Sequence, residues 1–171
     1  SFTVSSYTRA SSTVRLLGTT TPVDLAGLTF YDLVINKGAG TNTVNSTGGL
    51  TVTNTLTMTL GTWAPGAYTH DIANDWNDSG ITFTPGSGTI RLNGGGATQT
   101  ITQGGSNNFR NLIVNDDYDL GSLIDINGSL TINGGFTLDA GAFNIEIARN
   151  WTNNGTFSSG AAVIFNTTNT S

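Results

Sequence analysis

An internal repeat is the feature that most constrains the fold of this chain. Three landmarks occur twice in the same order: a segment Phe-x-x-Leu-apolar-apolar-Asn, a segment Gly-x-Leu-Thr-apolar, and a segment Ile-Ala-x-x-Trp. The paired landmark residues are Phe30 with Phe109, Leu50 with Leu130, and Trp76 with Trp151. Their offsets of 79, 80 and 75 residues indicate about two copies of a unit of 75–80 residues, at approximately 14–89 and 90–165, in one segment that covers 1–171.

The apolar residues fall in short clusters that glycine and asparagine separate. Only 10% of the residues are charged, and scattered apolar residues in such a chain would have indicated disorder. Short clusters between turn residues predict strands instead, and no window has helical periodicity. We therefore expect an all-β fold. The expected strands are Leu33–Ile35, Leu50–Val52, Leu56–Leu60, Ile81–Phe83, Ile90–Leu92, Leu112–Val114, Leu123–Ile126, Leu130–Ile132, Phe136–Leu138, Phe143–Ile147 and Val163–Phe165.

Two all-β architectures fit two repeats of this size. The first is a parallel β-solenoid (β-helix), in which each repeat wraps into three or so coils of roughly 20–30 residues. The second is a pair of tandem β-sandwich domains. We favour the solenoid because stacked coils place like residues at like corners, where an Asn amide can bond the neighbouring backbone. Asn36 and Asn115 both end the strand after Phe-x-x-Leu, and Trp76 and Trp151 share a later turn.

Residues 51–59 read TVTNTLTMT and place a threonine at every second position. Alternate side chains of a strand point to the same side, so these threonines would form one surface. The second copy retains the apolar positions, with a corner at Asn54 and Gly134. Its threonine positions, however, read Thr131, Asn133, Gly135, Thr137 and Asp139. An ice-binding surface needs threonines that repeat across successive coils, so we interpret this face as the solvated side of a strand.

Three motifs support a comparison with known repeats: Phe30-x-x-Leu33-Val34-Ile35-Asn36, Phe109-x-x-Leu112-Ile113-Val114-Asn115, and the Trp-x-x-x-Gly-x-x-Phe turn at 76–83. They resemble the repeats of large secreted or cell-surface bacterial proteins with a parallel β-helix fold. Members of such families are usually adhesive or structural. The resemblance therefore implies an adhesin-like role and carries over no catalytic residue.

Composition argues against several classes of partner. The formal net charge is −5, with one Lys and five Arg, whereas nucleic-acid binding needs a cluster of these residues. No stretch approaches about 18 consecutive apolar residues, so we expect no membrane span. The chain has no cysteine, which excludes a disulfide framework and a thiolate metal site.

Two acidic stretches are candidates for a cation site. The segment Asp75-x-Asn77-x-Ser79-Gly80 resembles the opening of a calcium loop, but its twelfth position, which needs a bidentate acid, is a glycine. We interpret it as an Asn/Asp-Gly turn. Asp116, Asp117 and Asp119 form a weak calcium candidate, which we interpret as a surface loop because the matching loop of the first copy contains no acid. We expect no other cofactor.

The sequence offers little for catalysis. His70, the single histidine, is expected to be an exposed residue of a loop flanked by Pro and Gly. The acids are spread along the chain and form no cluster of the kind that polysaccharide-active β-helix enzymes need. Trp63, Trp76 and Trp151 could form a sugar platform, but two of them occupy equivalent turns, so we favour packing at coil corners. We therefore expect that the protein is not an enzyme.

The ends of such a solenoid are open sheet edges, which pair readily with other strands unless they are capped. No charged or proline-rich cap is apparent at 1–4 or 162–171. The candidate self-assembly edges are Phe2, Thr3, Val4, Val163, Ile164 and Phe165. We predict a non-enzymatic, extracellular structural or adhesive repeat protein, which forms a surface stalk or a filament with adjacent repeats or copies of itself, head to tail. In one variant, Phe2–Val4 completes the sheet of a neighbour.

Two alternatives remain open. A carbohydrate- or ice-binding module, with surface glycans as partners in the first case, predicts a flat outward array or an exposed aromatic cluster. A polysaccharide-active β-helix enzyme, the weaker alternative, predicts at least two carboxylates that converge in a groove.

Overall fold

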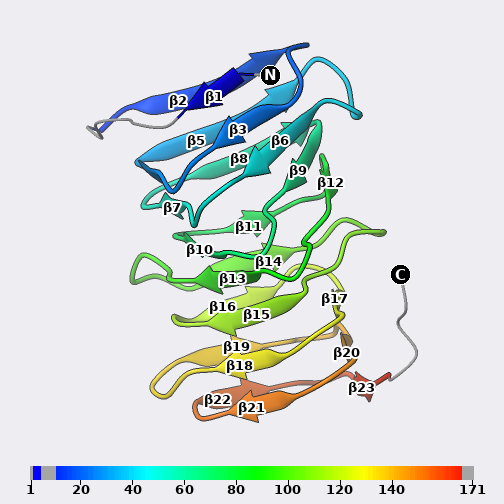
Figure 1. The fold of residues 1–171 in the computed structure, drawn as a ribbon. Coiled ribbons are helices and arrows are strands. Elements are labelled where there is room, and N and C mark those ends of the chain that lie inside the picture. The colour runs from blue at the N-terminus through cyan, green and yellow to red at the C-terminus, as the bar shows by residue number, and fades with distance from the viewer. Residues whose placement is uncertain (1, 5–10, 167–171) are drawn as a thin grey trace.

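The chain forms a parallel β-solenoid of about eight turns, with stacked coils about 20 residues apart (Figure 1). This computed structural model describes residues 2–4 and 11–166. The neighbouring strands of every sheet are paired in parallel, for example β5 with β8 and β13 with β15. Sandwich domains are built from antiparallel sheets, so the solenoid prediction is confirmed and the tandem sandwich is wrong. Across the described residues no helix has the length and apolar character needed to cross a membrane.

Each coil contributes strands to three faces. One face is a continuous seven-stranded sheet. Its strands are β4 (Thr29–Phe30), β7 (Thr51–Val52), β10 (Thr69–Ile72), β13 (Thr89–Leu92), β15 (Asn111–Val114), β18 (Leu130–Ile132) and β21 (Trp151–Asn153).

The second face is divided into a three-stranded sheet and a five-stranded sheet. The three-stranded sheet contains β2 (Thr13–Gly18), β5 (Asp32–Lys37) and β8 (Leu56–Leu60). The five-stranded sheet contains β11 (Trp76–Asn77), β14 (Gln99–Thr102), β16 (Tyr118–Leu120), β19 (Thr137–Asp139) and β22 (Thr156–Ser158).

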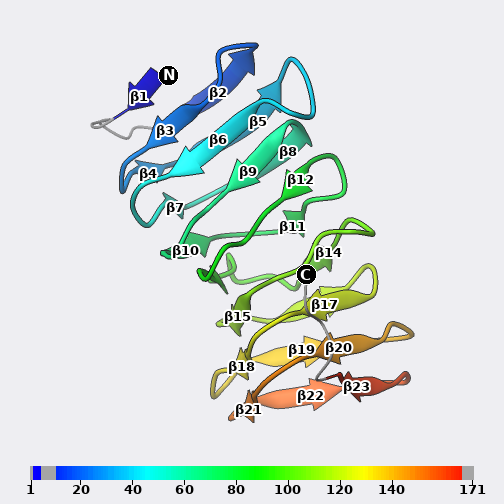
Figure 2. The same ribbon diagram turned by 45° about the vertical axis from the view of Figure 1, so that its right-hand side comes forward.

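The third face, seen in Figure 2, is also divided into two sheets. The first contains β1 (Phe2–Val4), β3 (Val23–Leu25), β6 (Thr43–Ser46), β9 (Thr62–Ala64) and β12 (Thr82–Phe83). The second contains β17 (Ile124–Ile126), β20 (Ile145–Ile147) and β23 (Val163–Phe165).

Side-chain amides replace backbone pairing where the third face is interrupted. Between β12 and β17, Phe109 contributes only an isolated bridge on this face. The Asn107 amide accepts a hydrogen bond from Phe83 N (3.0 Å) and donates to two backbone carbonyls of the preceding coil (2.9 and 3.0 Å). The Gln103 amide accepts from Asp125 N (2.6 Å) and donates to Asp125 O (3.2 Å). Each amide thus supplies the donor and acceptor that a strand would have supplied.

The core is a narrow column of inward-facing side chains from all three faces. Where the second and third faces change sheets, it is aromatic. Trp63, Trp76, Phe83 and Phe109 are packed with ring centroids 5.1 to 6.2 Å apart. All four are buried, and such contacts stabilise by about 0.5–1.5 kcal/mol per pair beyond the burial of area.

The prediction that His70 is an exposed loop residue is wrong. His70 lies in β10, is fully buried and packs edge-on against Trp63. The Leu50 N–H donates to Nδ1 (3.1 Å), and Nε2 lies 3.0 Å from the carbonyl oxygen of Pro65. The tautomer with the proton on Nε2 satisfies both partners. Burial of the ring lowers the pKa of His70, so the imidazole is a neutral core residue.

The sequence repeat and the coils are out of phase. On the seven-stranded face, the residue in register with Phe30 four coils later is Val114. Val114 lies five residues beyond Phe109 in the sequence. Trp76 likewise lies in β11 on the second face, whereas Trp151 lies in β21 on the seven-stranded face. The expectation that these pairs occupy like corners is therefore wrong, because coils of unequal length shift the phase. At about 20 residues per coil, the repeat unit also spans about four coils rather than three.

Candidate functional site

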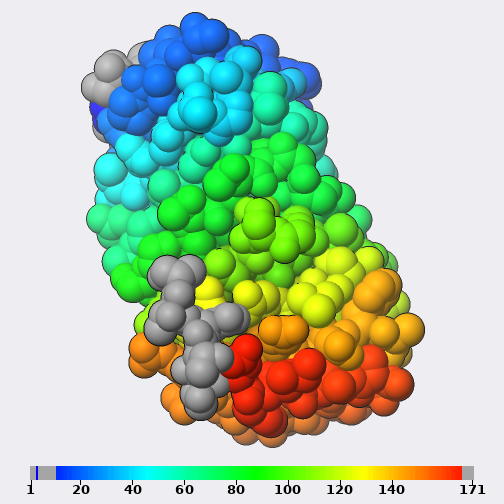
Figure 3. Space-filling view, turned by 90° about the vertical axis from the view of Figure 1, so that its right-hand side faces the viewer, coloured from blue at the N-terminus to red at the C-terminus, as the bar shows by residue number. Residues whose placement is uncertain are grey.

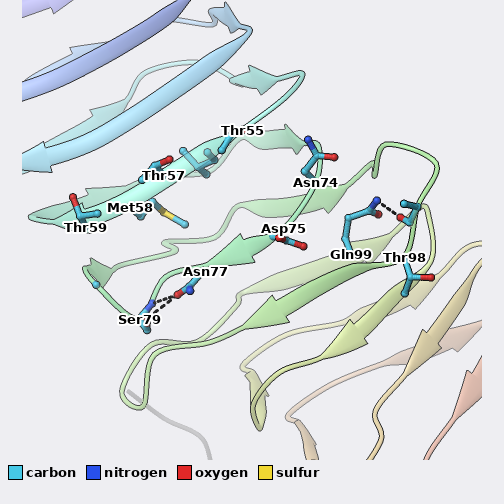
Figure 4. A pocket seen from close by; sticks show the side chains of 13 residues that line it. Thr55, Thr57, Met58, Thr59, Asn74, Asp75, Asn77, Ser79, Thr98 and Gln99 are labelled. Atoms are coloured by element: carbon cyan, nitrogen blue, oxygen red, sulfur yellow. Dashed lines mark hydrogen bonds between the residues drawn. The ribbon is translucent and has the colours of Figure 1, made fainter.

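A polar trough on the second face is the candidate site. Its volume is about 740 Å³. Figure 4 shows its layout: 55–59 of β8 and its approach form one wall, 97–99 form the other, and the floor lies between them. The floor residues are Asn74, Asp75, Asn77, Ser79 and Gly80.

The trough lies where the ladder of the second face is broken. β8 is the last strand of its sheet and β11 is the first strand of the next, so the two edges face each other without forming a ladder. Asn74, just before β11, has a left-handed backbone (φ 58°), which asparagine tolerates better than most residues. Its Nδ2 donates to Asn54 O (2.8 Å), and the Tyr118 hydroxyl donates to Asn74 O (2.9 Å). These bonds hold the corner at one end of the trough.

The floor alternates between outward polar and inward buried side chains. Asp75, Asn77 and Ser79 are exposed, whereas Trp76 and Asp78 between them are fully buried. This alternation extends the strand period beyond the two residues of β11. It places a carboxylate, an amide and a hydroxyl in one row at the bottom of the trough.

Hydrogen bonds fix the first two groups of this row. Asp75 Oδ1 accepts from Thr100 N (2.7 Å), which ties the carboxylate to β14. Asn77 Oδ1 accepts from both Ser79 N (3.1 Å) and Ser79 Oγ (2.6 Å). This is an Asx turn, in the segment that the sequence predicts as an Asn/Asp-Gly turn. With its oxygen used in the turn, Asn77 presents its amide N–H groups to the trough.

Asp78 is buried beneath the floor. Its Oδ1 accepts from Gly104 N (2.5 Å), and no described group bonds Oδ2. The indole N–H of the neighbouring Trp76 is also buried without a partner among the described residues. Burial raises the pKa of Asp78 to about 6, and the nearby polar groups of Gly104, Asn107 and Trp76 oppose the shift only in part.

The three acids of the weak calcium candidate have separate surroundings. Asp116 accepts hydrogen bonds from Asp117 N (2.9 Å) and Gly96 N (3.3 Å), and Asp117 accepts from Thr137 N (2.7 Å). Asp119 is exposed in β16. Within the described part of the chain, no group of three or more His, Asp or Glu is arranged to hold a metal ion.

The four residues expected to form ladders at turns lie in different parts of the solenoid. Asn115 belongs to a ladder that follows β13, β15 and β18: its Nδ2 donates to Asn93 Oδ1 and its Oδ1 accepts from Asn133 Nδ2, both at 2.9 Å. Asn36 is exposed in β5, on the second face. Trp76 is fully buried in the aromatic core, and Trp151 is half-buried in β21.

The candidate assembly edges lie at the two ends of the solenoid. Phe2–Val4 form β1, the first strand of its sheet, which pairs with β3 of the same chain. The donor-strand variant would have to break this pairing. Val163–Phe165 form β23, the last strand of its sheet, where Val163 is half-buried and both Ile164 and Phe165 are exposed.

Sequence reasoning missed the trough as a site. It treated the threonines and 75–80 separately, and nothing in the sequence placed 97–99 beside them. The register step from Trp76 to Ile101 is 25 residues, longer than an average coil, and only the structure reveals it. Comparison of the chain with protein-family models, with curated proteins and with solved structures gives no match.

Proposed function

We propose that the protein is a non-enzymatic structural or adhesive repeat protein of the cell surface, which extends into a stalk or filament through the open ends of its solenoid. The exposed apolar residues of the final coil carry this proposal. The adhesin-like role and the extracellular location rest on the resemblance of its repeats and on its composition, which is low in Lys and rich in Thr, Asn and Gly.

The inward-facing side chains of the last coil are partly uncovered, whereas those at the same positions of the preceding coil are buried. On each face, a fully or almost fully buried residue of the preceding coil is in register with an aromatic residue of the last coil that is half-buried or exposed. Phe165 is the most exposed of these, at 62%. The pairs in register are Leu130 with Trp151, Leu138 with Phe157, and Ile147 with Phe165. Trp151 contacts both phenyl rings, at centroid distances of 4.7 and 6.0 Å. In Figure 3 this coil forms one end of the molecule.

Another coil is the cover that fits these residues. Burying an aromatic side chain contributes about 1.5–3 kcal/mol, and a stacked strand would also satisfy the backbone groups at the edges of β21, β22 and β23. The first strands β1, β2 and β4 present the complementary edges at the opposite end. Adjacent repeats or a second copy could supply the cover, and the two arrangements make the same contacts.

Electron microscopy of the 171-residue chain across a concentration series tests this proposal. We expect unbranched end-to-end filaments whose length grows with concentration. Phe165→Asp should abolish them, because it places a charge in the end contact. Leu123→Asp is the matched control, since Leu123 is 42% exposed on the side of the solenoid. Wild-type chains that stay dispersed at every concentration, or side-to-side aggregation that only Leu123→Asp relieves, would overturn self-assembly through the ends.

A further inference from the structure

We propose that the polar trough between β8 and β14 binds a neutral oligosaccharide. This inference does not depend on end-to-end assembly, because the trough lies on the side of the solenoid. It would give the adhesive role a ligand and a location. A volume of about 740 Å³ is within the range of small-ligand sites, about 300–1,000 Å³.

Three neighbouring rows of outward polar groups line the trough and its rim. Thr57 and Thr59 project from β8, the row of Asp75, Asn77 and Ser79 forms the floor, and Thr100 follows on β14 in register. Sugar hydroxyls both donate and accept hydrogen bonds, so they need mixed partners. The rows provide these as hydroxyls, an amide donor and a carboxylate acceptor.

The floor is organised before any ligand arrives. Asp75 is held by the Thr100 N–H through one oxygen, and its other oxygen accepts no hydrogen bond from a described residue. The Asx turn directs the Asn77 amide nitrogen away from Ser79. Groups that are fixed in advance lose less conformational entropy on binding.

A buried polar atom in the wall supplies an independent observation. Gln99 lines the trough and is only 6% exposed. Its Nε2 donates to the carbonyl of Ala97, but its Oε1 has no partner among the described residues. A buried acceptor without a partner costs about 1–3 kcal/mol. Because Oε1 has almost no accessible surface, a ligand hydroxyl would remove that cost only if the Gln99 amide rotates toward the trough.

Charge and shape narrow the class of ligand. The lining contains the carboxylate of Asp75 and no Lys or Arg, so an acidic sugar would be repelled. A planar ice lattice needs a flat, repeating array, whereas this surface is concave and its middle row reads Asp, Asn, Ser. A peptide strand would need to pair with the edge of β8, but Gly80 lies so close that an added Cβ would be 2.7 Å from Met58 O. The class of ligand that remains after these exclusions is a neutral glycan.

NMR titration with maltotriose, cellotriose and tri-N-acetylchitotriose tests the proposal, with trigalacturonate as the acidic probe. The Phe165→Asp background keeps the chain monomeric if the ends assemble. We expect at least one neutral probe to shift the Asn77 side-chain amide and the Thr100 backbone amide, and trigalacturonate to shift neither. Asp75→Asn, which keeps an oxygen for the Thr100 N–H, should weaken binding at least tenfold.

Asp119→Asn is the matched control, because it makes the same change at an exposed position of the same sheet outside the trough. It should leave the affinity unchanged. The proposal is wrong if no neutral probe shifts these signals up to millimolar concentration, if trigalacturonate binds as well as the neutral probes, or if both Asp variants behave alike. None of these results bears on filament formation, which microscopy measures separately.

Discussion

Replacement of Asp78 by asparagine should stabilise the protein at neutral pH. The carboxyl is fully buried below the trough, with Oδ1 bonded to Gly104 N and Oδ2 without a described partner. Asparagine has nearly the same shape and retains an oxygen for the Gly104 N–H. The substitution therefore removes the cost of a buried charge while it keeps the Gly104 hydrogen bond.

The size of the effect follows from the pKa. Burial raises the pKa of Asp78 from 3.8 to about 6, and each pKa unit corresponds to about 1.4 kcal/mol. Because the folded state binds this proton more tightly than the unfolded chain, the carboxyl favours folding below pH 3.8, and this contribution is lost as the pH rises through about 6. At pH 7.5 the ionised carboxyl therefore costs about 3 kcal/mol. In a domain of this size that corresponds to roughly 6–12 °C in Tm.

Urea unfolding followed by tryptophan fluorescence measures the effect, since Trp63 and Trp76 are fully buried in the core. We expect Asp78→Asn to be more stable than wild type at pH 7.5 by about 1–3 kcal/mol, the lower value allowing for an unpaired amide N–H. The difference should shrink toward zero at pH 3.5. Asp119→Asn, at an exposed position, should show no such dependence. A constant difference across pH, or a variant that is less stable at pH 7.5, would refute the reasoning.

Two further predictions follow from the backbone packing and the core. Gly128→Ala should destabilise the protein by about 2–4 kcal/mol in chemical denaturation, because the added Cβ would overlap the Arg110 carbonyl oxygen. Gly105→Ala, whose Cβ would meet nothing within 4 Å, should change stability by less than about 1 kcal/mol, and equal losses would contradict this explanation. His70 should remain neutral below pH 6.5 in ¹⁵N NMR spectra, with the proton on Nε2, because burial lowers its pKa. Stability should correspondingly fall as the pH drops below 6.5, and a ring that protonates at 6.5 or above would contradict the effect of burial.

Strands with apolar inward residues were predictable from the sequence. Each of the eleven expected strands overlaps an observed one, because Leu, Ile, Val and Phe at alternate positions mark a buried strand side directly. The same pattern correctly assigned the threonines of 51–59 to the solvated side, with Val52, Leu56 and Met58 buried between them. The strands that it missed include polar inward residues, such as His70 in β10 and Gln99 in β14, whose burial depends on hydrogen-bond partners in other coils.

The candidate site was much less accessible to sequence reasoning. A turn at 75–80 could be predicted from its residue types, because the hydrogen bonds of such a turn are local. The trough could not be predicted in this way, since it joins three segments about 20 residues apart in sequence, and their proximity depends on the coil register. The burial of Asp78 was equally hidden, because a charged residue in a polar turn gives no local sign that it points inward.

The sequence by itself favoured a solenoid over tandem sandwiches, and it determined an all-β fold with short strands, Gly and Asn corners and a sparse charge. These properties depend on alternation and turn chemistry, which act over a few residues. Only the tertiary structure decided which residues share a face. A coil that is longer or shorter by a few residues moves every later side chain around the solenoid, so Phe109 and Trp151 do not stack in the columns of Phe30 and Trp76. The broken ladder, the trough and the exposed aromatic end all follow from this accumulated register, which no single segment of the sequence contains.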